Sequence, residues 1–324
     1  MSASLDVVIV NWNSGLHLRH CLDSLQPGRG EGLELRRVVV VDNASTDGSA
    51  VGLCYPSLPL VFLHNCENRG FAVACNQGAK DSQASYLLFL NPDVTLLKDS
   101  LRIPVRFMED PTNDRVGICG IQFVGPDGRV SRSCARFPTL GMFLLKMLGL
   151  EGVSVTFFLK LADHLESGVV DHVMGAFFLV RREVFQELKG FDERFFVYFE
   201  DLDFSYRAYK AGRPSCFLAS VQAQHVGGGS SNQVRAARMF YSLRSRIQYG
   251  FKHFGPIRSA VLLLATALIE PISRLTLGAA RGSLNEIQET FRAYEMFWRC
   301  LPKVVAKYGE FPPRHPLDKE LGID

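Results

Sequence analysis

Short apolar runs alternate with longer amphipathic stretches along the first third of the chain. The runs are rich in β-branched residues and apolar on both faces, which is typical of strands buried in a parallel sheet. We predict strands at Val7–Val10, Val38–Val41, Leu60–Leu63 and Tyr86–Leu90. The stretches between them predict helices at Leu16–Leu25, Asp47–Leu53 and Phe71–Lys80. Because crossovers between parallel strands are right-handed, this order predicts one open α/β sheet.

Polar residues directly follow each of the four predicted strands. These segments are Asn11-Trp12-Asn13, Asp42-Asn43, His64-Asn65 and Asn91-Pro92-Asp93. Ligands of open α/β sheets bind outside the carboxyl ends of the strands, so these side chains are candidates for a binding site. The alternative is that Asn and Asp only begin turns and cap helices there.

The pattern changes twice beyond the first four strands. It is irregular and turn-rich from Arg115 to Pro138, ordered again from Val169 to His225, and mainly helical with amphipathic spacing after that. We therefore expect an α/β domain over residues 1–230 and a mainly helical region over residues 231–324.

Three acidic residues follow an aromatic run, Phe195–Phe199. They are Glu200, Asp201 and Asp203, and they open a predicted helix that ends near Gly212. Acids are favoured at helix N-termini, which is one explanation of the cluster. Carboxylates in an apolar mouth can also have shifted pKa values and act as general bases.

Two further groups could bind a charged ligand. Asp93, at the end of a buried strand, suits a hard divalent cation shared with phosphate oxygens, and His225 is the best candidate for a second ligand. Arg244 and Arg246 could grip a phosphate in bidentate fashion, or could be solvated charges on a helix.

Composition and missing motifs exclude several classes. With 47% apolar and 21% charged residues, the chain is globular, and a net charge of +3 is too small to indicate nucleic-acid binding. No GxGxxG follows the first strand, and neither a GxxxxGK[ST] nor a GxSxG motif occurs. These absences weaken the dehydrogenase, P-loop NTPase and α/β-hydrolase interpretations.

The location of the protein is predicted from its cysteines and its apolar segments. Eight scattered cysteines without a CxxC pair, and no visible signal peptide, indicate reduced thiols in the cytoplasm. We expect no spanning helix, because the longest apolar candidate, Ser259–Ile269, is flanked by Arg258 and Glu270 and is too short. Basic residues among apolar ones over Phe240–Ala280 fit an anionic membrane surface, and a helix packed on protein or a homo-oligomer contact fits equally well.

Six sequence blocks in order carry a resemblance to a known family. They are VVIVNWN, VVVVDNASTDGS, NRGFAVACNQGA, LFLNPDV, MGAFFLVRREVFQELKGFDERFFVYFEDLDFSYRAYKAG and HVGGGSS, between about residues 5 and 255. The set resembles the family 2 glycosyltransferases and, within them, the bacterial rhamnosyltransferase-like branch. The resemblance implies a GT-A fold, which is a Rossmann-like nucleotide-sugar-binding sheet, with a helical C-terminal extension. It also implies a nucleotide-sugar donor and inverting transfer.

The resemblance assigns the donor pocket to four segments. Asp42 matches the carboxylate that holds the base and ribose end of the nucleotide. Asn11 and Asn13 line the same pocket, and Asn68 and Arg69 match its next wall.

The resemblance also assigns the reacting end of the site. Asn91-Pro92-Asp93 takes the place of the DxD motif but begins with Asn, so Asp93, together with His225, should bind Mg²⁺ or Mn²⁺. Gly175 and Ala176 match the loop near the donor sugar and the acceptor. Asp201 matches the catalytic base, and Glu200 beside it should contact the acceptor.

These assignments predict an inverting hexosyltransferase that acts in cell-surface polysaccharide synthesis, cell wall or O-antigen, at the inner face of the membrane. The expected donor is dTDP-L-rhamnose, with a UDP-sugar as the alternative, and the acceptor is a glycan or a polyprenyl-diphosphate-linked sugar. A sugar-nucleotide pyrophosphorylase would need a Gly-rich basic loop after the first strand, which Asn11–Gly15 does not supply. A catalytically silent relative acting as an assembly partner is the non-enzymatic alternative, which Asn91 favours slightly.

Overall fold

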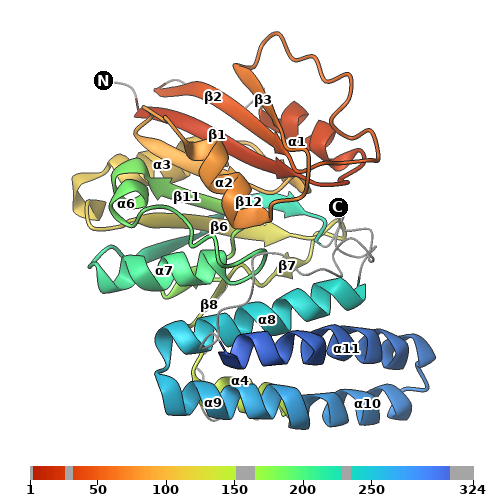
Figure 1. Cartoon of the computed structure of the whole chain (residues 1–324). Helices are drawn as coiled ribbons and strands as arrows, with labels where there is room; N and C mark the ends of the chain where they lie inside the picture. The colour runs from red at the N-terminus through yellow and green to blue at the C-terminus, as the bar shows by residue number, and fades with distance from the viewer. Residues whose placement is uncertain (1–2, 26–31, 151–164, 228–234, 307–324) are drawn as a thin grey trace. The chain divides into compact units, whose positions relative to one another are not determined.

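The computed structural model describes residues 3–25, 32–150, 165–227 and 235–306, with residues 303–306 described as backbone only. The chain divides into two compact units (Figure 1). The α/β unit comprises residues 1–137, 162–192 and 200–230, and the helical unit comprises residues 138–161, 193–199 and 231–324. The predicted boundary between residues 230 and 231 lies in segment 228–234, outside the described residues.

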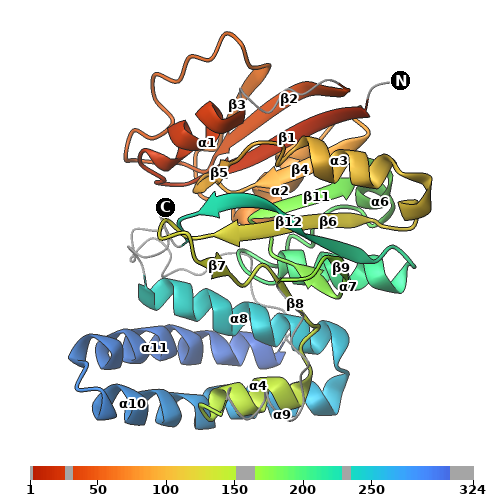
Figure 2. The same ribbon diagram turned by 180° about the vertical axis from the view of Figure 1, so that it is seen from behind.

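A mixed sheet of ten described strands forms the α/β unit (Figure 2). Its main path runs β3-β2-β1-β4-β11-β6-β12-β5, with β7 paired to β6 and β9 to β12. The strands are β1 (Ala3–Asn11), β2 (Leu33–Asp42), β3 (Leu60–His64), β4 (Tyr86–Leu90), β5 (Val94–Leu96), β6 (Ile118–Val124), β7 (Val130–Ser131), β9 (Gly168–Val170), β11 (Phe177–Arg181) and β12 (Ser215–His225). The first four are parallel to one another, as predicted, whereas β11 runs antiparallel between β4 and β6. A separate pair joins β8 (Cys134–Ala135) to β10 (His172–Val173).

Alternating side chains of the strands build one core on each face of the sheet. Leu5, Val7 and Ile9 of β1 belong to the core that includes helices α1 and α3. Val8 and Val10 belong to the core that includes α2, α6 and α7. The helices are α1 (His17–Leu25), α2 (Phe71–Ala79), α3 (Arg102–Glu109), α6 (Arg182–Glu187) and α7 (Glu200–Lys210), with a 3₁₀ turn η1 at Pro111–Asn113. Burial on both faces explains the continuous apolar runs of the parallel strands.

Two predictions about local structure are wrong. Residues 47–53 form a loop instead of a helix. The carboxylate of Asp47 accepts hydrogen bonds from the backbone N–H groups of Ser49 (2.9 Å) and Gly15 (2.7 Å), and Gly48 and Gly52 have φ angles of 75° and 65°. Asp commonly competes with helices in this way. The segment read as irregular after Arg115 contains β6, a central strand whose residues are all buried.

The helical unit contains a buried ion-pair network. Its described helices are α4 (Leu140–Met147), α8 (Arg235–His253), α9 (Pro256–Leu264), a π-helical turn η3 (Ala265–Ile269), α10 (Glu270–Ala280) and α11 (Leu284–Ala306). Glu270, only 2% exposed, pairs with Arg246 of α8 and with Arg274 at 2.7 Å. Burial alone would raise the pKa of Glu270, but the two guanidinium groups outweigh it and lower the pKa below its usual value. This network fixes α10 against α8.

One face of the run α9–η3–α10 is apolar and exposed. Ile257 (80% exposed), Leu264, Leu268 and Ile272 recur at helical spacing, with half-exposed Val261 between them. We call these five side chains the apolar face. Over Pro256–Ala280 the helix is long and apolar enough, by length and composition, to cross a membrane, with 39% of its most apolar window buried in the protein. The helix therefore extends beyond the predicted apolar segment Ser259–Ile269, because the structure continues it through Glu270, and the expectation that no helix spans a membrane stays a prediction.

Candidate active site

The carboxyl ends of three neighbouring strands bring their last residues into line. Asn11 pairs in register with Asp42, and Asp42 pairs with His64. This alignment follows from the strand ends themselves, because the parallel strands stop at the same edge of the sheet. His64 was part of the strand-end pattern but had no predicted role. Its Nδ1 lies 3.8 Å from Oδ2 of Asp42.

Asn11 and Asp42 form the buried base of this edge. Asn11 is fully buried, and its Nδ2 donates to Oδ1 of Asp42 (2.8 Å) and reaches the hydroxyls of Ser45 (3.0 Å) and Ser49 (2.9 Å). Oδ2 of Asp42 accepts from the backbone N–H of Ser45 at 3.3 Å. The Asp42 carboxylate is 6% exposed and held from several sides, so its orientation is fixed.

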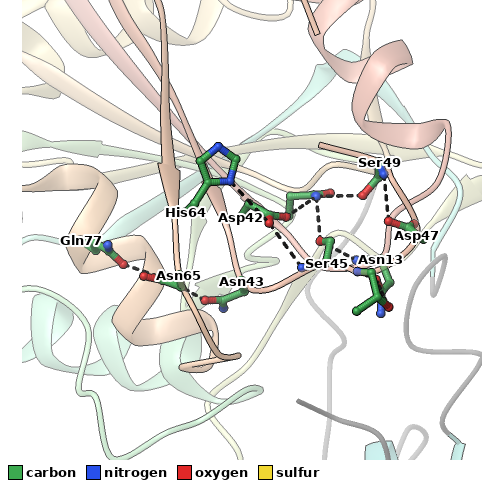
Figure 3. Close-up of polar contacts among 11 residues, drawn as sticks. Asn13, Asp42, Asn43, Ser45, Asp47, Ser49, His64, Asn65 and Gln77 are labelled. Carbon is green, nitrogen blue, oxygen red and sulfur yellow. Dashed lines mark hydrogen bonds and ion pairs between the residues drawn. The ribbon is translucent and has the colours of Figure 1, made fainter. Parts of the chain in front are cut away.

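A loop above this base is tied to Asn13. Figure 3 shows the contacts between the loop Ser45–Ser49 and the turn after β1. Oδ1 of Asn13 accepts from the backbone N–H of Thr46 at 2.8 Å, and the N–H of Asn13 donates to Ser45 at 3.0 Å. Asn13 has a φ of 47°, a left-handed conformation that Asn tolerates better than most residues. The predicted pocket residues Asn11, Asn13 and Asp42 are thus brought together.

A chain of amides forms the adjoining wall. Asn65 donates to Oδ1 of Asn43 (2.8 Å) and contacts Oε1 of Gln77 (3.0 Å), as Figure 3 shows. The same Asn43 oxygen lies 3.4 Å from the backbone nitrogen of Arg69, whose side chain is exposed. Oδ1 of Asn68 accepts from the N–H of Gly70, which opens α2. Asn68 and Arg69 therefore adjoin the strand-end residues, and Asn43, Asn65 and Gln77 are neighbours without a predicted role.

Asp93 and His225 meet although they are far apart in sequence. Oδ1 of Asp93 lies 3.3 Å from Nε2 of His225, because β5 pairs with the end of β12. Both side chains are largely buried, at 11% and 14% exposed, and the imidazole packs on Phe123 at 5.0 Å between ring centroids. The backbone N–H of Asn91 donates to the carbonyl of Ala176 (2.9 Å), which links this loop to the next part of the site.

The carboxylate of Asp201 lies against the backbone of Gly175. The N–H of Gly175 donates to Oδ2 of Asp201 at 2.8 Å, and the N–H of Leu202 donates to Oδ1 at 2.8 Å. A Cβ added at Gly175 would lie 2.6 Å from that Oδ2, so a larger residue there would displace the carboxylate or the backbone of the loop. Asp201 keeps 19% of its side chain exposed. A fixed and partly accessible carboxylate of this kind can accept a proton.

Glu200 differs from its neighbour in environment. It is 5% exposed, and burial, followed by the charges of Asp201 and Asp203, raises the pKa of Glu200 well above its usual value. Asp203 is instead paired with Arg207 at 2.8 Å on the same helix. The three acids of the cluster thus have three different surroundings.

His172 is a site residue that sequence reasoning missed. Its Nε2 lies 3.6 Å from Oδ2 of Asp201, and its Nδ1 lies 3.1 Å from the hydroxyl of Ser205. Burial lowers the pKa of His172, although the charges of Asp201 and Asp171 oppose that shift. Only its position two residues before the MGAFF block, which begins at Met174, could have drawn attention to it.

The two predicted phosphate-binding arginines belong to α8 of the helical unit. Arg244 and Arg246 are 1% and 6% exposed, so the interpretation as solvated charges is wrong. Arg246 is engaged by Glu270, and Arg244 lies over the ring of Tyr241 at 6.0 Å. Neither contact tests a phosphate-binding role, which stays a prediction for both arginines.

The comparisons with known proteins now identify the family. The model for glycosyl transferase family 2 matches residues 6–189, more than half of the chain. The chain belongs to this family. The N-acetylglucosaminyl-diphospho-decaprenol L-rhamnosyltransferase of Mycobacterium tuberculosis is 29% identical over 264 residues, covering 74% of this chain and 81% of that protein. Rhamnosyltransferase WbbL of Escherichia coli is 27% identical over 184 residues, covering 56% and 68%.

Solved structures share the fold. The mannosyltransferase PcManGT from Pyrobaculum calidifontis, solved with GDP-Man and Mn²⁺, aligns over 98% of this chain and 83% of its own, with a TM-score of 0.54 and 19% identity. TarS 1-349 of S. aureus, solved with UDP, aligns over 94% and 88%, with a TM-score of 0.51 and 18% identity. These likenesses confirm the predicted GT-A fold, and the family confirms that the chain is a glycosyltransferase.

Proposed function

We propose that this glycosyltransferase transfers L-rhamnose from dTDP-L-rhamnose to a polyprenyl-diphosphate-linked N-acetylglucosamine at the inner face of the membrane. The names of the mycobacterial and Escherichia coli relatives support rhamnose as the sugar, and the mycobacterial name supports the lipid-linked acceptor. The observation that carries the enzymatic role is the carboxylate of Asp201, held on the Gly175 N–H with part of its surface open.

Asp201 serves as the general base of direct displacement in this proposal. Each carboxylate oxygen accepts one backbone hydrogen bond, which leaves lone pairs for the acceptor hydroxyl. As that proton moves to Asp201, the hydroxyl oxygen bonds to the anomeric carbon, and the bond from that carbon to the diphosphate breaks. The configuration at the anomeric carbon is therefore inverted. Proton transfer to a positioned base contributes about 10²–10⁴-fold to a rate.

The strand-end network holds the nucleotide in this proposal. Asn11 and the two serines keep the Asp42 carboxylate in one orientation, ready for the donor groups of the ribose and base. Asn13, Asn68 and Arg69 form the walls. A rigid polar base of this kind needs little reorganisation when the donor binds.

Asp93 and His225 fit a divalent cation. Two ligand atoms bound at about 2.1 Å and at right angles lie about 3.0 Å apart, close to the observed 3.3 Å. The described residues contain no group of three or more His, Cys, Asp and Glu side chains that could hold a metal, so diphosphate oxygens and water would complete the shell. A Mg²⁺ or Mn²⁺ ion there would neutralise charge on the departing diphosphate. Asn91 in the first motif position does not alter these two ligands.

The apolar face of the helical unit docks on an anionic lipid surface in this proposal. Residues 255–283 carry three arginines and a single acid, Glu270, which is buried and paired. Arg258 and Arg281, near the two ends of this stretch, are exposed. An aliphatic face with cationic flanks and without an exposed acid is the pattern of an interfacial helix, and it brings the enzyme to a lipid-linked acceptor.

Vesicle co-sedimentation tests the docking. Wild type should bind vesicles with 30% anionic lipid and detach in high salt. The variant Leu264→Gln/Leu268→Gln should lose binding yet keep donor affinity, whereas Val169→Gln, a control at a 71% exposed position in β9, should bind normally. Undiminished binding by the double variant would contradict the proposal. The proposal would also be contradicted if wild type did not bind vesicles but formed a dimer in solution, and the double variant were a monomer.

A thermal-shift panel tests the donor. The ligands are dTDP, UDP, GDP and their sugars, each with Mn²⁺ and with EDTA. A ligand at a hundredfold excess over its Kd adds about 2.7 kcal/mol of stability. We expect the largest metal-dependent shift with dTDP-L-rhamnose. A larger shift with a UDP-sugar would show that the donor is a UDP-sugar instead. No shift with any nucleotide would favour a catalytically silent assembly partner.

A further inference from the structure

A buried imidazole bridges two side chains on one face of α7. Asp201 and Ser205 are four residues apart, which places them above one another on the helix surface. The ring of His172 reaches both, with Nε2 3.6 Å from Oδ2 of Asp201 and Nδ1 3.1 Å from the Ser205 hydroxyl. Only 12% of the His172 side chain is exposed. β10, which carries the ring, is paired with β8, so its backbone is held independently of α7.

The hydrogen-bonding capacities of these groups select one tautomer. An ionised carboxylate only accepts, so a proton on the nitrogen that faces Asp201 at 3.6 Å gives a favourable contact, whereas a lone pair there would be repelled. In the neutral ring Nδ1 is then an acceptor, and Ser205 can donate its hydroxyl proton to it. Burial, which disfavours the charged ring, supports the neutral form. The charged groups that act on the ring are Asp201 and Asp171.

We propose that His172 is a positioning residue for the catalytic base: its Nε2–H faces Oδ2 of Asp201 at 3.6 Å, just beyond hydrogen-bond distance, and Ser205 holds the ring. This inference rests on the proposed role of Asp201. The Gly175 N–H fixes the same oxygen from the loop side, so the carboxylate is held from two elements. Without the imidazole, the carboxylate could rotate away from the acceptor hydroxyl, and misplacement by about 1 Å can cost about 10²-fold in rate.

Single-turnover transfer by His172 variants tests the proposal. His172→Phe keeps the ring volume but removes the donor, and His172→Gln restores an N–H near the position of Nε2. We expect His172→Phe to lower kcat by 10- to 100-fold with unchanged donor Kd, and His172→Gln to recover most of the loss. Ser205→Ala should shift kcat in the same direction by a smaller factor.

A double-mutant cycle separates positioning from structural support. In the Asp201→Asn background, His172→Phe should cause no further loss of kcat, because the group it positions is gone. Additive losses, or a fall in kcat that only follows a lower folded fraction, would overturn the role of His172. If Asp201→Asn itself transfers normally, the proposed base fails. Normal kcat in His172→Phe beside an inactive Asp201→Asn would refute the His172 proposal alone.

Discussion

The contact between Gly175 and Asp201 makes glycine necessary at this position. A Cβ built on Gly175 lies 2.6 Å from Oδ2 of Asp201 and 3.1 Å from its Cβ and Cγ. The carboxylate cannot remain in place, because separations below 3.0 Å essentially never occur for real Cβ atoms. The substitution Gly175→Ala therefore moves the proposed base without changing its chemistry.

The size of the effect follows from the displacement. Ordinary contacts begin at 3.4 Å, so Oδ2 must retreat by about 0.8 Å and its hydrogen bond to the Gly175 N–H must lengthen. A displacement of nearly 1 Å at a reacting group costs about 10²-fold, or about 2.7 kcal/mol in activation free energy. We expect kcat to fall by that factor, with the donor Kd unchanged because the proposed nucleotide-binding residues Asn11 and Asp42 lie on other strands.

The assay is single-turnover sugar transfer with saturating donor and acceptor. Gly168→Ala is the matched control, because no atom lies within 4 Å of a Cβ built there, and it should retain full activity. Melting temperatures should be recorded for both variants. A Gly175→Ala enzyme with wild-type kcat, or one whose loss appears only in donor affinity, would refute the reasoning.

Three other perturbations have defined outcomes. Glu270→Ala should lower the free energy of unfolding by about 3–5 kcal/mol in urea titrations, because it leaves buried arginine charge uncompensated. The control Glu286→Ala, which breaks an exposed pair with Arg281, should lower it by about 0–1 kcal/mol. Equal losses in the two variants would contradict this prediction. The pKa of Glu200 is raised, so the folded state disfavours the charged carboxylate. This loss of folding free energy is absent below the usual pKa of 4.5 and grows as the pH rises above it. Glu200→Gln should therefore gain stability relative to wild type between pH 5 and pH 8, and a stability difference that stays constant with pH would count against this reasoning. Asp93→Ala should weaken donor binding in Mn²⁺ and have little effect in EDTA, and an equal loss in both would remove its ligand role.

Much of the strand-end part of the candidate site could be predicted because it follows from strand periodicity. Apolar runs in β1, β2 and β3 mark where the strands end, and the next residues must share one edge of the sheet. Asn11, Asp42 and His64 meet for that reason. The acidic start of α7 was also predictable, since acids favour a helix N-terminus and Gly212 has the left-handed φ of 75° suited to a helix end.

Other features depend on contacts that no local pattern encodes. His172 lies on a two-residue strand, too short for any alternation, and its partner Asp201 belongs to a different element. The loop at residues 47–53 is different, because its poor helix formers Asp47, Gly48 and Gly52 were visible in the sequence, and the carboxylate of Asp47 bonds to the backbone. Arg246 resembled a free cation in sequence because its partner Glu270 lies on another helix. For His172 and Arg246 the tertiary pairing decided the outcome, whereas in the loop the local residues Asp47, Gly48 and Gly52 did.

The most direct test of the central claim compares wild type with Asp201→Asn, using dTDP-L-rhamnose, Mn²⁺ and a polyprenyl-diphosphate-linked N-acetylglucosamine. Transfer is measured in a single turnover, and donor binding is measured by calorimetry on the same samples. We predict that wild type forms a rhamnosylated lipid, and that Asp201→Asn binds the donor equally well but transfers about 10²–10⁴-fold more slowly. Transfer at the wild-type rate by Asp201→Asn would contradict the account.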